Sequence, residues 1–252
     1  MVSNKFFILS ISLLFSILGS SIFLNILLFN QAKKYYFQVN EARLDPSGLS
    51  HYPVNIKKSI DKDKIRVVFF GDSRADAWIS PSISGYEFIN RGIHAQTSAQ
   101  TVQRFASHVR SLQPNIVIIQ VGVNDLKTVA LFPESRNSIV ANCRENIKRI
   151  VDESKSLGAT VILTTIFPVG EAPIQRKPFW SDDIESAVNE VNVYINTLAE
   201  DKVIIFDAFS ILVDSQGMML QKYASDELHL NNQGYEILNQ ELVKVVDKIA
   251  SN

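Results

Sequence analysis

Short, largely apolar runs alternate with segments of helical periodicity from residue 65 to the C-terminal end of the sequence. Such runs are typical of strands buried on both faces of a parallel sheet, because neither face of the strand meets water. The sequence therefore predicts an α/β fold with a mainly parallel, doubly wound, five-stranded sheet and helices on both faces. The predicted strands are Ile65–Phe70, Tyr86–Ile89, Ile116–Val121, Thr160–Ile166 and Val203–Phe206, and the predicted helices span 98–112, 137–157, 182–200 and 233–249.

The N-terminal segment points to a membrane. No charged side chain occurs from Phe6 to Ala32. At about 1.5 Å per residue, the stretch Phe6–Phe29 reaches roughly 36 Å, enough to cross the hydrocarbon core. The run is longer than the apolar part of a signal peptide, which favours an uncleaved, single-pass anchor at residues 1–32. A patch of small residues at 18–21 keeps cleavage, and then secretion, as the alternative.

The charges that flank this segment leave its orientation open. Lys33 and Lys34 follow it and only Lys5 precedes it, so charge counting alone places the remaining chain in the cytoplasm. N-terminal segments of this kind usually serve export, however, and we expect the domain outside the cytoplasm. Residues 33–64 are polar and predict a tether, with partial docking on the domain as the alternative; the domain itself is expected at 65–252.

Composition argues against several classes of function. The 25 Lys and Arg and the 26 Asp and Glu give a net charge of −1, which offers no electrostatic case for nucleic acid as the partner. The one cysteine allows neither an intrachain disulfide nor a cysteine zinc site, and the four histidines lack metal-ligand spacing. We expect no metal and no other cofactor. Cys143 lies in an apolar helical stripe and is expected to be an ordinary buried side chain.

Chemically useful residues follow several of the predicted strands. In a parallel sheet the carboxyl ends of the strands lie at one edge, where ligands bind. Ser73, Gly92 and Asn124 come at such ends, and the pair Asp226 and His229 precedes the last predicted helix. Each is ordinary alone, since serine caps helices and asparagine and glycine are common in turns. Together they offer a nucleophile, two hydrogen-bond donors for an oxyanion, and an oriented base.

At this point the sequence resembles a known family, the SGNH or GDSL hydrolases. The family is defined by four sequence blocks, and all four occur here in the family's order. They are GDSRADAW around Ser73, NRGIHAQTS around Gly92, GVND around Asn124, and DELHLNNQGY around Asp226 and His229. The blocks span nearly the whole predicted domain, and the ordered set is far more specific than any one of them.

The resemblance implies a three-layer α/β/α sandwich of flavodoxin-like type that hydrolyses esters or thioesters through an acyl-serine. It implies Ser73 as nucleophile, His229 as base and then acid, and Asp226 as the group that orients His229. The oxyanion hole would be formed by the N–H groups of Ser73 and Gly92 and the side chain of Asn124. Asp72 and Asp125 would be structural, binding N–H groups of their turns.

The sequence departs from the family at two places. Arg74 replaces the leucine that usually follows the nucleophile, a change that leaves Ser73 in place. In the second block, His94 and Ala95 stand where small residues such as serine and glycine are expected. Ala95 would restrict the turn and His94 would intrude on the mouth of the pocket, so both bear on substrate preference more than on catalysis.

A long loop after the fourth predicted strand is the expected source of specificity. Residues 167–181 exceed a typical connection of about 2–6 residues. We expect Phe179 and Trp180 to line the substrate pocket and Arg176 and Lys177 to face an anionic headgroup or the membrane; the alternative is that the aromatic rings pack in the core.

The leading hypothesis is thus a membrane-anchored serine esterase acting on lipid-type or small acyl esters. An esterase or acyltransferase acting on O-acyl groups of envelope carbohydrate is the alternative, because the same residues serve both reactions. A binding module without activity is a third hypothesis, which a missing catalytic residue would have favoured, and none is missing.

Overall fold

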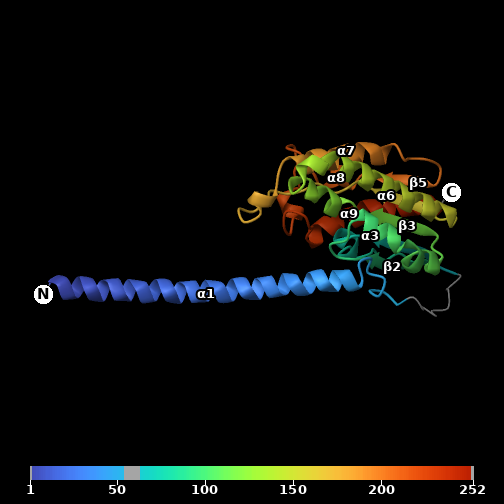
Figure 1. Ribbon diagram of the computed structural model, residues 1–252. Helices are drawn as coiled ribbons and strands as arrows, with labels where there is room; N and C mark the ends of the chain where they lie inside the picture. Colours follow the sequence, from blue (N-terminus) through green and yellow to red (C-terminus); the bar gives the residue numbers. More distant parts are fainter. Residues whose placement is uncertain (1, 54–62, 251–252) are drawn as a thin grey trace. The chain divides into compact units, whose positions relative to one another are not determined.

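The computed structural model describes residues 2–53 and 63–250 and forms two compact units, Met1–Pro46 and Ser47–Asn252. The first unit is one continuous helix, α1 (Val2–Leu44) (Figure 1). Its segment Asn4–Leu44 has a mean hydropathy of 2.3 in its most apolar window and is long enough to span a membrane. Residues 33–44, assigned above to the tether, continue this helix, because the first proline after it is Pro46.

The second unit is built on a five-stranded, fully parallel sheet, which confirms the predicted fold class. The strand order is β2-β1-β3-β4-β5, so the chain starts in the middle of the sheet and winds outward in both directions. The strands are β1 (Ile65–Gly71), β2 (Tyr86–Gly92), β3 (Ile116–Gln120), β4 (Thr160–Thr164) and β5 (Val203–Phe206). The core strands are buried on both faces, as their apolar sequences require.

Helices cover both faces of the sheet and enclose two apolar cores (Figure 1). One face packs against α3 (Ser98–Gln103), α4 (Phe105–His108), α6 (Arg136–Ser156) and α7 (Asp183–Asn196). The other packs against α8 (Ala208–Leu212) and α9 (Asn232–Ala250). Short elements complete the unit: α2 (Ser73–Asp76), α5 (Val123–Leu126) and the 3₁₀ turns η1 (Arg110–Leu112), η2 (Lys127–Ala130), η3 (Pro133–Ser135), η4 (Lys177–Phe179) and η5 (Gln221–Tyr223).

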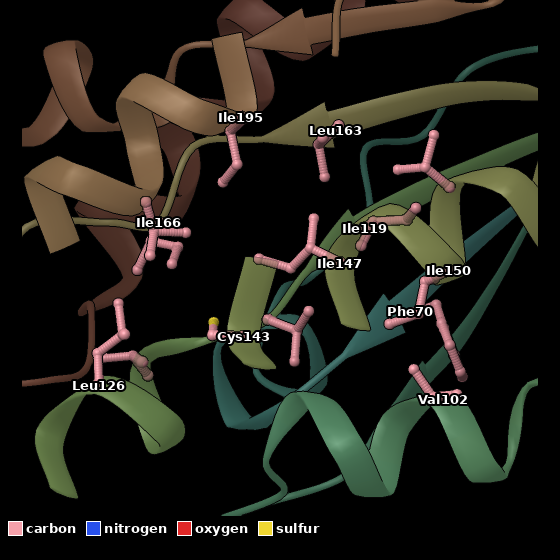
Figure 2. Packing of buried hydrophobic residues seen from close by; sticks show 14 of the residues in the cluster. Phe70, Val102, Ile119, Leu126, Cys143, Ile147, Ile150, Leu163, Ile166 and Ile195 are labelled. Carbon is pink, nitrogen blue, oxygen red and sulfur yellow. The ribbon is translucent and has the colours of Figure 1, made fainter. Parts of the chain in front are cut away.

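Figure 2 shows the first core, in which Ile147 of α6 lies near Ile119 of β3, and Cys143 of α6 lies on the side of Leu126 and Ile166. Cys143 is fully buried, and burial raises the pKa of its thiol. This environment fits an inert packing residue, as expected. The helix predicted over 98–112 is instead divided into α3, α4 and η1, with one break at Arg104, whose side chain is buried, and a second at Val109.

Candidate active site

The turn that carries Ser73 follows directly from the buried strand β1. Asp72 caps α2, and its Oδ1 accepts a hydrogen bond from the N–H of Arg74 at 2.9 Å. Gly71 has a φ of 156°, and a Cβ at this position would lie 1.7 Å from the carbonyl oxygen of Gln120. Only glycine allows this close turn, which places Ser73 first in α2. Within the described residues, the N–H of Ser73 has no acceptor.

Ser73, His229 and Asp226 form a continuous chain of contacts. Ser73 Oγ lies 3.0 Å from His229 Nε2, and His229 Nδ1 lies 2.8 Å from Asp226 Oδ2. The carboxylate is fixed from behind, because Oδ1 accepts the N–H groups of Leu228 at 2.8 Å and of His229 at 2.7 Å. Partial burial would raise the pKa of Asp226, but the hydrogen bonds from His229 and from these two N–H groups outweigh it and lower that pKa.

Asn124 lies at the same edge of the sheet, in α5, with a buried side chain. Its Nδ2 donates to the carbonyl oxygen of Gln96 at 3.0 Å, and its Oδ1 accepts from Lys127 Nζ at 2.7 Å. Lys127 thereby fixes which end of the amide carries the donors. Since Nδ2 has two hydrogens, one remains available after the bond to Gln96.

Gly92, the expected second oxyanion donor, has an N–H that is already engaged. It donates to Asn90 Oδ1 at 2.8 Å. Glycine is needed here for packing, because a Cβ at 92 would lie 2.1 Å from the backbone nitrogen of Asp76 in α2. The N–H of Gly92, which we expected to bind the oxyanion, therefore donates to Asn90 instead. This part of the oxyanion prediction is corrected.

Ala95 offers a free N–H three residues further on. It is exposed and adopts a left-handed backbone conformation, with a φ of 61°, which costs free energy for a residue with a Cβ. Its N–H donates to no group among the described residues. The next residue, Gln96, is the one that Asn124 Nδ2 binds, so the loop that carries Ala95 is tied to the asparagine.

Comparison with known proteins decides the family. Residues 69–237 match the model of the GDSL-like Lipase/Acylhydrolase family. The chain belongs to this family. The matched range contains Ser73, Gly92, Asn124, Asp226 and His229, so the resemblance inferred from the four blocks is confirmed. Residues 69–237 accordingly form a domain of an ester-hydrolysing family.

Solved structures of the same fold and one curated relative are similar to this chain. A GDSL-like lipase from Bacteroides thetaiotaomicron VPI-5482 is similar with a TM-score of 0.58 and 24% identity, over 82% of this chain and 97% of that one. An acetyl xylan esterase is similar with a TM-score of 0.58 and 22% identity, over 72% and 100%. "Uncharacterized lipoprotein YqeF" of Bacillus subtilis (strain 168) is 26% identical over 142 residues, 49% of this chain and 57% of that protein's length.

In this GDSL-family chain, Arg74 stands where the family usually has leucine, and it is fully buried. Its guanidinium donates to three backbone carbonyl oxygens: Nε to Leu228 at 2.7 Å, Nη1 to Phe167 at 2.9 Å and Nη2 to Pro168 at 3.2 Å. Burial lowers the pKa of Arg74 to about 10, although nearby Asp72 opposes this shift. Arg74 therefore ties the nucleophile turn to the loop that carries Asp226 and His229.

The two aspartates expected to be structural bind backbone N–H groups. Asp72 caps α2, and burial raises the pKa of its carboxyl to about 6. Asp125 holds the start of α3: Oδ2 accepts the N–H of Ser98 at 2.8 Å and Oδ1 accepts its hydroxyl at 2.6 Å. His94 is exposed and lies nearly parallel to His229, with 5.8 Å between ring centroids.

The residues of the loop after β4 that we expected to bind substrate differ in their exposure. Phe179 is 63% exposed, whereas Trp180 is half-buried and packs against the core. Arg176 and Lys177 are exposed, and Arg176 Nε lies 3.0 Å from Glu227 Oε1, a buried carboxylate next to Asp226. This ion pair links Arg176 to the loop that carries Asp226, and the expectation that Arg176 and Lys177 face an anionic headgroup or the membrane stays a prediction.

A cavity of about 750 Å³ lies against this same loop. Four carboxylates and two amides contribute to its wall, together with Ser225, Met218 and Met219; the carboxylates and amides are those of Glu171, Asp214, Asp226, Glu227, Gln216 and Gln221. Neither Phe179 nor Trp180 lines it. No cluster of three or more His, Cys, Asp or Glu side chains suited to a metal ion occurs in ranges 2–53 and 63–250.

Proposed function

We propose that the protein is a membrane-anchored serine ester hydrolase that works through an acyl-serine. The observation that carries this proposal is the continuous chain of contacts from Ser73 Oγ through His229 to Asp226. A nucleophile, a base within 3.0 Å and a carboxylate that orients the base are the parts that such a reaction requires.

In the acylation step, His229 Nε2 accepts the proton of Ser73 while Oγ attacks the carbonyl carbon of the ester. The N–H groups of Ser73 and Ala95 and the side chain of Asn124 then stabilise the oxyanion. The intermediate collapses when His229 returns its proton to the departing alcohol. A water molecule, activated by the same imidazole, hydrolyses the acyl-serine and restores Ser73. An alcohol acceptor in place of water would give acyl transfer.

The anchor confines this reaction to a membrane surface. α1 supports that role, because it is long and apolar enough to span a bilayer and its described side chains are exposed apart from Asn40. The name of the similar B. subtilis lipoprotein agrees with attachment to the cell envelope. We place the catalytic unit outside the cytoplasm, and we expect full-length protein to require detergent for extraction. Recovery of unprocessed protein in the aqueous fraction would contradict the anchor.

Two experiments test the hydrolase. A fluorophosphonate probe should label Ser73 in wild-type protein, and p-nitrophenyl esters from acetyl to palmitoyl should be turned over with a preference that reveals the acyl site. Exposed Phe179 and half-buried Trp180 are the proposed contacts of the acyl chain. Protein that is folded but neither labels nor hydrolyses any ester would instead be a binding module.

The polar cavity favours a second candidate, an esterase for O-acyl groups on envelope carbohydrate. Its wall of carboxylates and amides suits a leaving group with several hydroxyls and disfavours an anionic headgroup. The similarity to an acetyl xylan esterase points the same way. Comparing kcat/KM for an acetylated oligosaccharide with that for a lysophospholipid discriminates between the two substrate classes.

The oxyanion hole gives the first quantitative prediction. Replacement of Asn124 by alanine should lower kcat by about 10²–10³-fold, because one donor to the transition-state oxyanion is lost. The measurement is steady-state kinetics on the best ester of the panel. Asn196→Ala on the exposed side of α7 is the matched control and should leave kcat unchanged. A folded Asn124→Ala enzyme with wild-type kcat would remove Asn124 from the mechanism.

Lys127 gives a second prediction, since its Nζ fixes the amide of Asn124. We expect Lys127→Met to lower kcat by about 10-fold, the value of a hydrogen bond from a charged group, with little change in KM. Lys127→Arg should recover part of the loss because it keeps a cationic donor. Lys244→Met removes an exposed lysine that pairs with Glu241, and serves as the control. If KM instead rises by about 10-fold and kcat does not change, Lys127 acts in substrate binding.

A further inference from the structure

A short segment between the membrane helix and the first strand packs on the loop that carries Ala95. Residues 47–52, called the strap here, follow α1 closely in the sequence and belong to the compact catalytic unit. They lie outside the range matched by the family model, which begins at residue 69. The strap contacts the loop at both ends of the turn that holds Ala95.

The first contact involves Ser47 and Gln96. Gln96 Nε2 donates to the carbonyl oxygen of Ser47 at 2.8 Å, and the Ser47 hydroxyl donates to Gln103 Oε1 in α3. On its other side, Gln96 Oε1 accepts from Arg104 Nε at 2.5 Å. The Gln96 side chain is 5% exposed and is thus held between the strap and a buried arginine.

The second contact involves Tyr52 and Gly92. The Tyr52 hydroxyl donates to the carbonyl oxygen of Gly92 at 2.5 Å. The Arg91 guanidinium lies 4.5 Å from the centroid of the Tyr52 ring, and the ring packs edge-on against His108. The imidazole of His108 lies in turn 3.2 Å from the carbonyl oxygen of Leu49. The strap therefore contacts the rest of the unit at its middle as well as at both ends.

These two contacts bracket a strained turn. Gly92 and Gln96 stand on either side of Ala95, whose left-handed backbone conformation must be imposed by its surroundings. The backbone oxygen of Gln96 also accepts from Asn124 Nδ2. A shift of Gln96 would therefore move two of the three proposed oxyanion donors, Ala95 N–H and Asn124 Nδ2, at once.

We propose that Ser47 and Tyr52 are positioning residues that hold the oxyanion loop in its active conformation. The strap then contributes to catalysis, and the catalytic unit begins at Ser47 and not at Ile65. This inference rests on the proposed hydrolase function, because it concerns the loop that would bind the oxyanion. It adds to that function a dependence on residues that touch neither the substrate nor the triad.

The test uses the full chain in detergent with substitutions at Tyr52. Tyr52→Ala removes both the hydroxyl and the ring, and we expect about a 10-fold fall in kcat with KM within about twofold of wild type, because loss of transition-state geometry affects kcat most. Tyr52→Phe keeps the ring on Arg91 and should give a smaller fall. The rate of fluorophosphonate labelling at Ser73 should decrease in the same order.

Tyr86 is the matched control. Its hydroxyl also contacts a backbone carbonyl, that of Val246 at 3.5 Å, but at the opposite end of the sheet. Tyr86→Ala should lower the melting temperature and leave kcat unchanged. In a double-mutant cycle, Tyr52→Ala should cost less in an Asn124→Ala background than in wild type, since both act on one loop.

Each outcome decides a different claim. Tyr52 variants that melt lower but keep the kcat of the Tyr86 control would overturn the positioning role. If Tyr52→Ala does not fold, the kcat of Tyr52→Phe decides, and wild-type kcat there overturns the proposal. Wild-type protein that fails to label or to hydrolyse esters would overturn the hydrolase function itself, and the positioning role with it.

Discussion

Replacing Ser73 by alanine should abolish ester hydrolysis while the protein stays folded. The expected loss is about 10⁴–10⁶-fold in kcat, since the remaining donors supply only residual catalysis once the nucleophile is gone. The change removes one hydroxyl, whose contact in the described structure is with His229 Nε2, and leaves the cap at Asp72 and the packing of α2 intact. Steady-state hydrolysis and covalent labelling by a fluorophosphonate measure the loss.

The control for this variant is Ser138→Ala, which removes an exposed hydroxyl from α6. It should match wild type in turnover, labelling and melting temperature. Residual activity above about 1% in purified Ser73→Ala protein would mean that the nucleophile lies elsewhere. Labelling of the variant at another serine would identify that residue directly.

Replacing Asp226 by asparagine should lower kcat by about 10⁴-fold, the second-largest expected effect. Oδ1 of asparagine can still accept the N–H groups of Leu228 and His229, so the loop should keep its shape. The amide would then face His229 Nδ1 with a donor in place of a carboxylate. This favours the tautomer whose Nε2 carries the proton, which cannot accept the proton of Ser73. The measurement is kcat, with melting temperature as the check on folding.

The pH dependence of stability reports on the Asp226 carboxylate. Because hydrogen bonds hold the pKa of Asp226 below its ordinary value, the carboxylate stays ionised in mildly acidic buffer. Its contribution to stability is present above the ordinary value and is lost only as the pH falls through the lowered pKa. We therefore expect the melting temperature to hold on mild acidification and to lose this contribution only in stronger acid, and unfolding measured across pH checks this. A melting temperature that already falls in mildly acidic buffer, and does not fall in Asp226→Asn, would contradict the lowered pKa of Asp226.

The strands and long helices could be predicted from the sequence because their signals are local. Buried parallel strands must be apolar on both faces, and α6 shows one apolar stripe along its length. The prediction of a single helix over 98–112 is wrong, because tertiary contacts override the local helical periodicity. Arg104 turns inward to donate to the carbonyl oxygens of Gly71 and Arg91, both at 2.7 Å, and the helix breaks there.

The tether shows a similar limit. Polar composition at 33–64 indicated a linker, yet residues 33–44 are helical and residues 47–52 dock on the catalytic unit; residues 54–62 lie outside the described residues. Docking of Ser47 and Tyr52 depends on Gln96 and Gly92, which lie 49 and 40 residues away in the sequence. Such long-range contacts cannot be predicted from the periodicity or the motifs of the sequence.

Taken by itself, the sequence determined the fold class, the long apolar N-terminal helix and the set of residues that meet at the sheet edge. The order of strands and the motif blocks dictate which residues come after each strand. Only the tertiary structure decided which N–H groups are free. Gly92 has the right residue type, but its N–H is consumed by Asn90, whereas Ala95 is held in a left-handed turn with its N–H unengaged among the described residues. The physical reason is that hydrogen-bond availability depends on neighbours in space, and residue type alone does not encode them.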